Sequence, residues 1–126
     1  MRILVDTQML LWHLENDKRL SVSRGEYIED PANQILVSIA SLWEIGIKMS
    51  IKKLSLVKPL DSIFDHIERS TSSILPIQPA HIIGVSKLPL HHRDPFDRLI
   101  ISQALVENVP VLSSDGVFHK YGVELL

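Results

Sequence analysis

Short apolar runs alternate along the chain with longer segments in which apolar residues recur every three or four positions. The first pattern is typical of buried strands and the second of amphipathic helices. Strands are predicted over residues 2–6, 33–38, 74–77, 110–115 and 122–126. Helices are predicted over residues 7–15, 21–30, 39–51, 60–70, 80–88 and 96–108. Because the two kinds of element alternate and each strand is apolar throughout, we expect an α/β fold with a central parallel sheet covered on both faces.

The length and composition narrow the class of protein. A chain of 126 residues can bury one hydrophobic core, and no repeat or linker divides it, so we expect a single domain over residues 1–126. The net charge of −2 provides no basic field that would attract polyanions, and a nucleic-acid role would need local basic patches or bound cations. The absence of cysteine excludes a disulfide framework, a thiol nucleophile and a thiolate zinc site.

The N-terminal segment lacks the layout of a signal peptide. Asp6 interrupts its apolar run, and Glu15 and Asp17 end it without a small-residue cleavage site. No uninterrupted apolar run approaches the roughly 18 residues that a membrane span needs. We therefore expect a soluble, cytoplasmic protein.

Two aspartates directly follow predicted strands. Asp6 ends the first strand, and Asp115 ends the strand predicted over residues 110–115. In open parallel sheets ligands bind beyond the carboxyl ends of the strands, which makes both residues candidates for a functional site. The alternative is a structural role, because aspartate is common after a strand as a turn residue or helix N-cap.

Glu44 lies on the helix predicted over residues 39–51 and borders its apolar face. That face comprises Ile39, Leu42, Trp43, Gly46 and Ile47. Glu44 is either a functional acid or the partner of Lys48 in a surface ion pair worth about 0.3 to 0.5 kcal/mol.

The stretch HHRDPFDRLI contains two aspartates three residues apart. Asp94 is predicted to be the N-cap of the following helix, with Pro95 at its first position. Asp97 begins a helical row that continues through apolar residues three, four, seven and eight positions later, so this row faces the interior. Since burying an unpaired acid is costly, Asp97 should reach a cleft, a cation or a buried partner.

Four acids are therefore candidates for one site at the sheet edge: Asp6, Glu44, Asp97 and Asp115. Four carboxylates gathered there would repel one another unless cations lay among them. Hard oxygen ligands suit Mg²⁺ or Mn²⁺, and carboxylate-held Mg²⁺ suits phosphoryl chemistry.

Stretches across the whole chain resemble the PIN-domain nucleases, and within them the VapC-type toxins of toxin–antitoxin pairs. The matching stretches, in family order, are ILVDTQMLLW, VSIASLWEIGIK, LPLHHRDPFDRLIISQA and VLSSD, followed by a closing YGVELL. The resemblance implies a three-layer α/β/α PIN domain acting as a Mg²⁺- or Mn²⁺-dependent endoribonuclease, in which an acidic quartet holds the metal that activates water. It also implies a cognate antitoxin and a homodimer.

By motif position, the resemblance implies that the catalytic and metal-binding residues are Asp6, Glu44, Asp97 and Asp115. Asp6 and Asp97 are the foremost metal ligands, and the other two complete the site or act through water. Ser113 stands where relatives commonly have threonine, which leaves room for a hydroxyl contact near the metal.

Two residues depart from the family pattern, and two other functions stay open. Gln8 stands where relatives often have histidine, and Ser114 where many have arginine, which weakens an expected contact with RNA or phosphate. The alternatives are an RNA-processing PIN nuclease without an antitoxin and a non-catalytic PIN-like binding module. A phosphoacceptor receiver domain does not fit, because it needs an acidic pair after the first strand and Asp6 stands alone.

Histidines, tryptophans and basic residues complete the candidates. Adjacent histidines in an extended loop point to different sides, so His91 and His92 are predicted to contact solvent or RNA rather than a metal. Trp12 and Trp43 are predicted to lie in the core or a subunit interface. For six basic residues the sequence is compatible with two roles, a solvated side chain or a contact with phosphate: Lys48, Lys52, Lys53, Lys58, Arg93 and Arg98.

Overall fold

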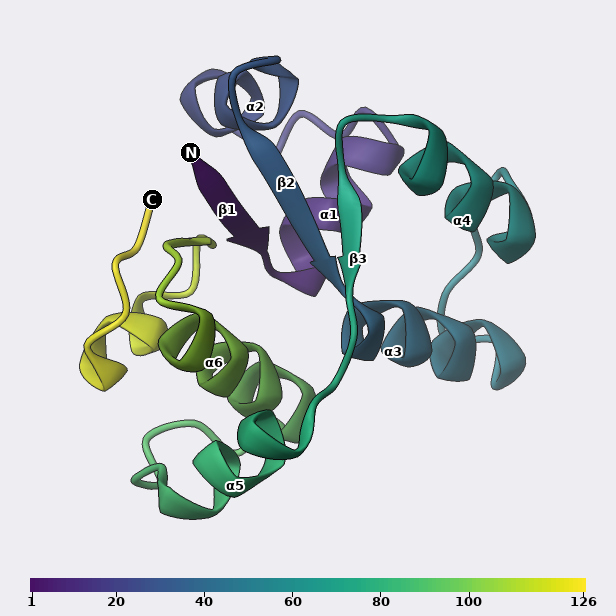
Figure 1. Cartoon of the computed structure of the whole chain (residues 1–126). Helices are drawn as coiled ribbons and strands as arrows, with labels where there is room; N and C mark the ends of the chain where they lie inside the picture. Colours follow the sequence, from purple (N-terminus) through teal and green to yellow (C-terminus); the bar gives the residue numbers. More distant parts are fainter.

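The strands form one parallel sheet in the order β3-β2-β1-β4, of which Figure 1 shows β3, β2 and β1 side by side. The computed structural model describes residues 1–126. The strands are β1 (Arg2–Val5), β2 (Gln34–Ser38), β3 (Ser73–Leu75) and β4 (Val111–Leu112). The chain places β2 and β3 on one side of β1 and then returns to place β4 on the other side. The strand order therefore reverses between β1 and β4, and the expected parallel sheet is confirmed.

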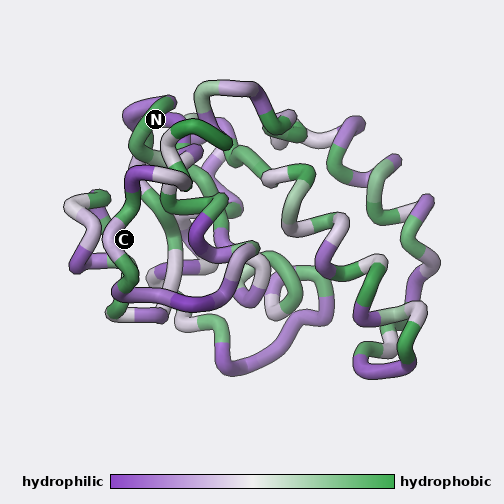
Figure 2. The backbone as a smooth tube through the Cα atoms, turned by 90° about the horizontal axis from the view of Figure 1, so that it is seen from below, coloured by the Kyte–Doolittle hydropathy of each residue, from purple (hydrophilic) through white to green (hydrophobic).

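Every predicted helix is present. The helices are α1 (Thr7–Leu14), α2 (Val22–Glu29), α3 (Ile39–Ser50), α4 (Leu60–Arg69), α5 (Pro79–Lys87) and α6 (Pro95–Glu107), with a 3-10 helix, η1 (Gly116–Tyr121), near the end. The helical segments carry both hydrophobic and hydrophilic positions (Figure 2), as helices with one buried and one exposed face do. Side chains cap five of these helices: Asp6 for α1, Ser21 for α2, Ser38 for α3, Asp94 for α6 and Asp115 for η1.

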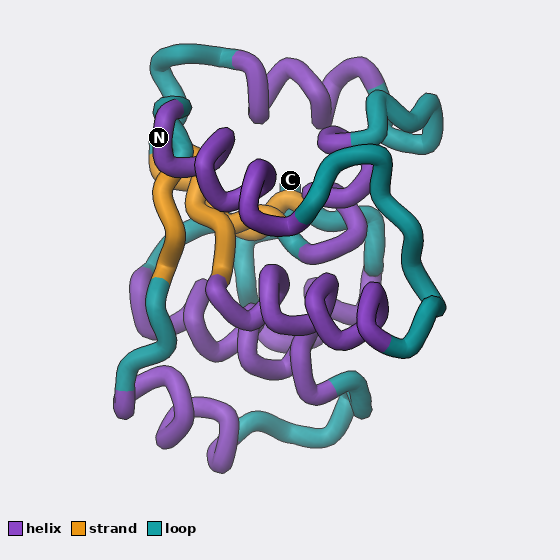
Figure 3. Tube along the Cα trace, turned by 90° about the vertical axis from the view of Figure 1, so that its right-hand side faces the viewer, coloured by secondary structure: helices purple, strands orange, loops and turns teal.

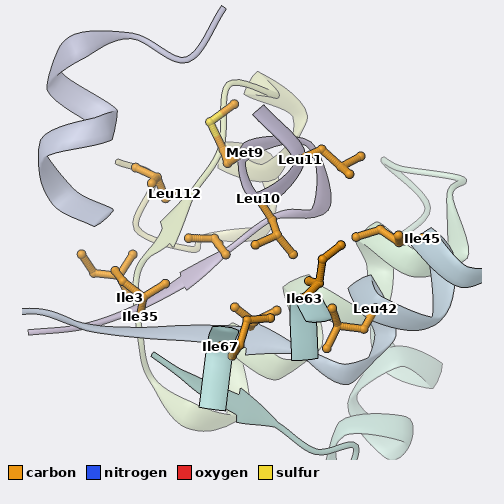
Figure 4. Packing of buried hydrophobic residues seen from close by; sticks show 12 residues of the cluster. Ile3, Met9, Leu10, Leu11, Ile35, Leu42, Ile45, Ile63, Ile67 and Leu112 are labelled. Atoms are coloured by element: carbon orange, nitrogen blue, oxygen red, sulfur yellow. The ribbon is translucent and has the colours of Figure 1, made fainter. Parts of the chain in front are cut away.

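Alternate residues of each strand pack on opposite faces of the sheet, and helices lie on both sides of it (Figure 3). In β1, Ile3 and Val5 belong to one core cluster and Leu4 to the other. The first cluster joins the sheet to α1, α3 and α4; Figure 4 shows Ile63 and Ile67 of α4 among its members. The second cluster joins the sheet to α6 and η1. The three-layer α/β/α prediction is confirmed.

The strand predicted over residues 122–126 is reduced to a single bridge, between Val111 and Leu125. The backbone still pairs there, since Val111 N–H donates to Glu124 O at 2.8 Å and Leu126 N–H donates to Val111 O at 2.9 Å. The reason is that β4 is only two residues long and offers one residue for pairing on its outer side. Residues 116–121, for which no element was predicted, form η1.

The apolar face predicted for α3 coincides with its buried face only at Leu42, which belongs to the first core cluster. Trp43 is 61% exposed, whereas Ala40, Ser41, Glu44 and Ile45 are buried. The predicted stripe lines an open apolar groove beside Leu60 and Phe64 of α4. Of the two positions predicted for Trp43, the core is therefore wrong, and a subunit interface stays a prediction. Trp12 is half-buried against the first core cluster, in agreement with the prediction.

No helix combines the length and apolarity that crossing a lipid bilayer requires.

A buried histidine joins α5 to α6. His81 is fully buried, and its Nδ1 accepts a hydrogen bond from Gln78 N–H at 2.9 Å. Its Nε2 lies 3.1 Å from Glu107 Oε2. The backbone oxygen of His81 accepts a hydrogen bond from Ser102 Oγ at 2.6 Å. Because Gly84 has no side chain, the backbone of α5 can approach Ser102 closely enough for this contact.

Replacing Gly84 by alanine should destabilise the fold. A Cβ at this position would lie 2.3 Å from Ser102 Oγ, so the hydroxyl would have to leave His81 O. We expect Gly84→Ala to lower the free energy of unfolding by about 1 to 3 kcal/mol in urea denaturation. The matched variant Gly25→Ala in α2, whose Cβ would meet nothing closer than Leu20 Cδ2 at 3.9 Å, should be neutral or stabilising by up to about 1 kcal/mol.

Adding Ser102→Ala to Gly84→Ala tests whether the collision with the Ser102 hydroxyl causes the loss of unfolding free energy. The double variant removes the colliding hydroxyl and leaves a Cβ–Cβ separation of 3.5 Å, which is ordinary contact. Its loss of stability should be smaller than the sum of the two single losses. Simple additivity would mean that the collision is not the cause.

Candidate active site

The four candidate acids line one cleft at the carboxyl ends of β1 and β4, where the strand order reverses. This is where open parallel sheets bind their ligands. The cleft has a volume of about 270 Å³. Its lining comprises Asp6, Thr7, Gln8, Leu11, Glu44, Lys48, Asp94, Asp97, Ser114 and Asp115. The convergence that the sequence predicted is thus present, with Asp94 as a fifth acid.

Asp6 is buried at the floor of this cleft. Its Oδ1 accepts a hydrogen bond from Met9 N–H at 2.7 Å, which caps α1, and its Oδ2 accepts one from Ser113 Oγ. Burial raises the pKa of the Asp6 carboxyl above its ordinary value, against the lowering effect of these two hydrogen bonds. Asp6 therefore both caps α1 and lines the cleft, so the two roles considered for it are not exclusive.

Ser113 and Asp115 follow β4 and are held by contacts with each other. Ser113 Oγ donates to Asp6 and also accepts a hydrogen bond from Asp115 N–H at 3.0 Å. Asp115 Oδ1 accepts one from Val117 N–H at 3.0 Å, which starts η1. The hydroxyl contact that the sequence suggested for Ser113 is made with Asp6, and it places Asp115 at the same time.

Glu44 is only 6% exposed and reaches the cleft from α3. Its Oε2 lies 2.8 Å from Lys48 Nζ, so the ion pair predicted as its alternative role is present inside the cleft. This contact with Glu44, with further contributions from Asp94 and Asp97, raises the pKa of Lys48. Lys48 is thus a cation held among the acids.

Asp97 projects into the cleft from the first turn of α6, as its helical row predicted. Burial raises its pKa from 3.8 to about 7, with additional contributions from the charges of Asp94, Asp6 and Glu44 and an opposing one from His92. Asp94 caps α6 as predicted, since its Oδ1 accepts hydrogen bonds from Phe96 N–H at 2.9 Å and Asp97 N–H at 3.4 Å. Asp94 also lines the cleft, where its charge contributes to the raised pKa of Asp97.

His92 was not predicted to lie in this site. Its side chain is only 16% exposed, and its Nε2 lies 2.9 Å from Asp115 Oδ2 and 3.1 Å from Asp97 Oδ2. The prediction of a solvent-facing side chain is therefore wrong for His92, whereas His91 is exposed as predicted. The motif alone gave no signal for this, because side-chain directions in a loop follow no period.

Arg98 also differs from both of its predicted roles. Its guanidinium donates hydrogen bonds to the backbone oxygens of four residues in the segment before α6: Val85, Leu88, Pro89 and His92. It therefore holds the loop that carries His92 instead of facing solvent or a phosphate.

The donor set fits a hard divalent cation. Carboxylate oxygens from several elements face one cleft in which Lys48 contacts Glu44, and burial raises the pKa of Asp97 there with added contributions from the charges of Asp94, Asp6 and Glu44. A carboxylate oxygen of Asp97 and one of Asp115 lie within 4.8 Å of each other. Such oxygen-rich sets suit Mg²⁺ and Mn²⁺.

Comparisons with known proteins identify the fold. The family model described as PIN domain matches residues 3–124. The chain belongs to the PIN-domain family. The resemblance drawn from the motifs is thereby confirmed at the level of the family. No curated protein sequence matches the chain.

Several solved structures have a similar fold. VapBC2 from Rickettsia felis, bound to a promoter DNA fragment, matches this PIN domain with a TM-score of 0.75 and 16% identity, over 100% of this chain and 98% of that chain. DNA-bound VapBC from Salmonella typhimurium matches with a TM-score of 0.73 and 14% identity, over 100% and 97%. VapBC-1 from nontypeable Haemophilus influenzae matches with a TM-score of 0.72 and 15% identity, over 100% of this chain and 97% of that chain. At these identities the likeness concerns the fold.

The stability of the cation-free PIN domain should depend on pH through Asp97. Folded Asp97 keeps its proton up to about pH 7, whereas the unfolded chain releases it near 3.8, so raising the pH between these values favours unfolding. In EDTA, the advantage in Tm of Asp97→Asn over the wild type should grow from about pH 4 to pH 7 and then level off.

Asp65→Asn, the same change at an exposed position of α4, serves as the control and should show no such growth. A difference in Tm between Asp97→Asn and wild type that is independent of pH would contradict the assignment.

Proposed function

We propose that this PIN domain is a divalent-cation-dependent endoribonuclease and the toxin of a toxin–antitoxin pair. The observation that carries the proposal is the cleft in which Asp6, Glu44, Asp97 and Asp115 face one another at the point of strand reversal. Asp6 and Asp97 are proposed as the principal ligands, with Glu44 and Asp115 completing the set. A bound Mg²⁺ or Mn²⁺ would supply Lewis-acid activation of water and neutralisation of the phosphate charge.

The remaining residues of the cleft support phosphodiester hydrolysis. Lys48 provides a positive charge that a scissile phosphate can meet, although its partner Glu44 already contacts it at 2.8 Å. Lys52 and Lys53 follow α3 and are exposed, so they are proposed to contact more distant phosphates of a polyanion. These local charges would offset the net negative charge of the chain, which otherwise repels RNA.

The toxin assignment is supported by the full-length similarity of the fold to VapBC complexes. We accordingly propose that a cognate antitoxin protein binds this PIN domain and blocks or distorts the acidic cleft. A homodimer is proposed as its assembly. A gene for a small antitoxin beside that of this chain would favour this assignment over an RNA-processing nuclease without an antitoxin.

Cleavage of RNA is the first test. Antitoxin-free protein incubated with total cellular RNA and Mn²⁺ or Mg²⁺ should produce new 5′ ends that EDTA abolishes. Asp6→Asn should produce none, because it removes a carboxylate that the site requires, whereas the charge-matched exposed variant Asp65→Asn should cleave like the wild type. Sequencing of the 5′ ends identifies the RNA and the bond.

The absence of new ends from folded wild-type protein would leave two explanations, a nuclease whose RNA is missing from the extract or a non-catalytic binding module. Calorimetric titration with Mn²⁺ would then distinguish a nuclease lacking its substrate from a non-catalytic binding module, since only the former needs the cation.

The two aspartates of the DPFD motif should respond differently to the same substitution. Asp97→Asn should abolish cleavage. Asp94→Asn should retain cleavage and lose about 1 kcal/mol or less of unfolding free energy, since asparagine also serves as an N-cap and can accept from Phe96 N–H. Single-turnover cleavage and urea denaturation measure the two effects. Equal loss of activity in both variants, with folding intact, would refute this division of roles.

A further inference from the structure

His92 is fixed by a partner at every polar atom it has. Its backbone N–H donates to Tyr121 Oη at 2.6 Å, and its backbone oxygen accepts from Arg98 Nη1 at 3.3 Å. Its ring Nδ1 accepts from Asp94 N–H at 3.2 Å, and its Nε2 lies 2.9 Å from Asp115 Oδ2. The ring also packs edge-on against Phe118. The imidazole therefore has one orientation, with Nε2 aimed at the acids.

The contact at Nδ1 determines which nitrogen carries the proton. A backbone N–H can only donate, so Nδ1 must offer its lone pair to Asp94 N–H. The ring proton then lies on Nε2, between Asp115 and Asp97. A histidine that binds a metal has the opposite arrangement, with a free lone pair toward the ion and an N–H donated from the other nitrogen.

We propose that His92 is a positioning residue of the cleft and not a cation ligand. Its Nε2–H donates to Asp115 and faces Asp97, which holds together two carboxylates that come from the loop after β4 and from α6. With the imidazole outside the ligand set, the cation meets only oxygen atoms, the environment that favours Mg²⁺ and Mn²⁺ over zinc. The effect on cation binding rests on the proposed function of this cleft, whereas the position of the ring proton does not.

The position of the ring proton can be measured directly. In protein labelled with ¹⁵N-histidine, long-range ¹H–¹⁵N correlation spectra distinguish a protonated from an unprotonated ring nitrogen. His81 is an internal reference, because its Nδ1 also accepts a backbone N–H and its Nε2 also lies against a carboxylate. The spectrum of His92→Gln assigns the His92 signals by their loss.

We expect His92 to carry its proton on Nε2 alone, both in EDTA and with saturating Mg²⁺. A protonated Nδ1 in either condition would overturn the proposal, because it would free Nε2 for the cation or break the contact with Asp94. Since the measurement in EDTA needs neither cation nor RNA, its outcome is independent of the nuclease proposal.

The effect on the carboxylates is measured by the affinity for Mg²⁺ in calorimetry. His92→Ala removes the donor and should weaken binding about 10- to 100-fold, as loss of a residue that orients metal ligands typically does. His92→Gln, whose amide nitrogen can donate from a similar place, should bind nearly as the wild type does. His91→Ala, at the exposed neighbour, should be unchanged. Unaltered affinity in His92→Ala, or equal loss in folded His92→Gln, would overturn the proposal; failure of the wild type to bind Mg²⁺ would instead refute the proposed function.

Discussion

Asp6 is buried at the end of β1, and its carboxylate must find hydrogen-bond donors there because water cannot supply them. The donors are Met9 N–H, at the start of α1, and the hydroxyl of Ser113, after β4. Since Ser113 also accepts from Asp115 N–H, the same contact places the second acid that follows a strand. One buried carboxylate thus organises two segments from opposite ends of the chain, and the cleft forms between them.

Much of this site could be predicted from the sequence because its features follow local periodicity. An acid directly after an apolar run lies at a strand end, which placed Asp6 and Asp115. An acid on the apolar row of a helix faces inward, which placed Asp97. The parallel sheet then brings these positions to one edge. The family motifs agree with this reading, but the convergence needs only the fold.

The remaining features depend on contacts between residues that are far apart in the sequence. His92 is oriented by Tyr121 and Asp115, which are 29 and 23 residues away. The depth of Glu44 depends on how α3 rotates against its neighbours, and the exposed Trp43 shifted the predicted apolar stripe away from the buried side of the helix, which it shares only at Leu42. The prediction of a strand over residues 122–126 was wrong because pairing there is limited by the two-residue length of β4. A pattern along one segment contains none of this information.

One hydrogen bond between uncharged groups also links the two helices that carry acids into the cleft. Ser38 Oγ, at the start of α3, donates to Gln103 Oε1 of α6 at 2.6 Å in a buried position, and α3 carries Glu44 while α6 carries Asp97. Salt screens interactions between exposed charges but does not weaken a buried contact of this kind. Binding of a polyanion, by contrast, weakens steeply as salt rises. Ionic strength would therefore act on the attraction of a polyanion to this cleft and leave the spacing of its acidic helices unchanged.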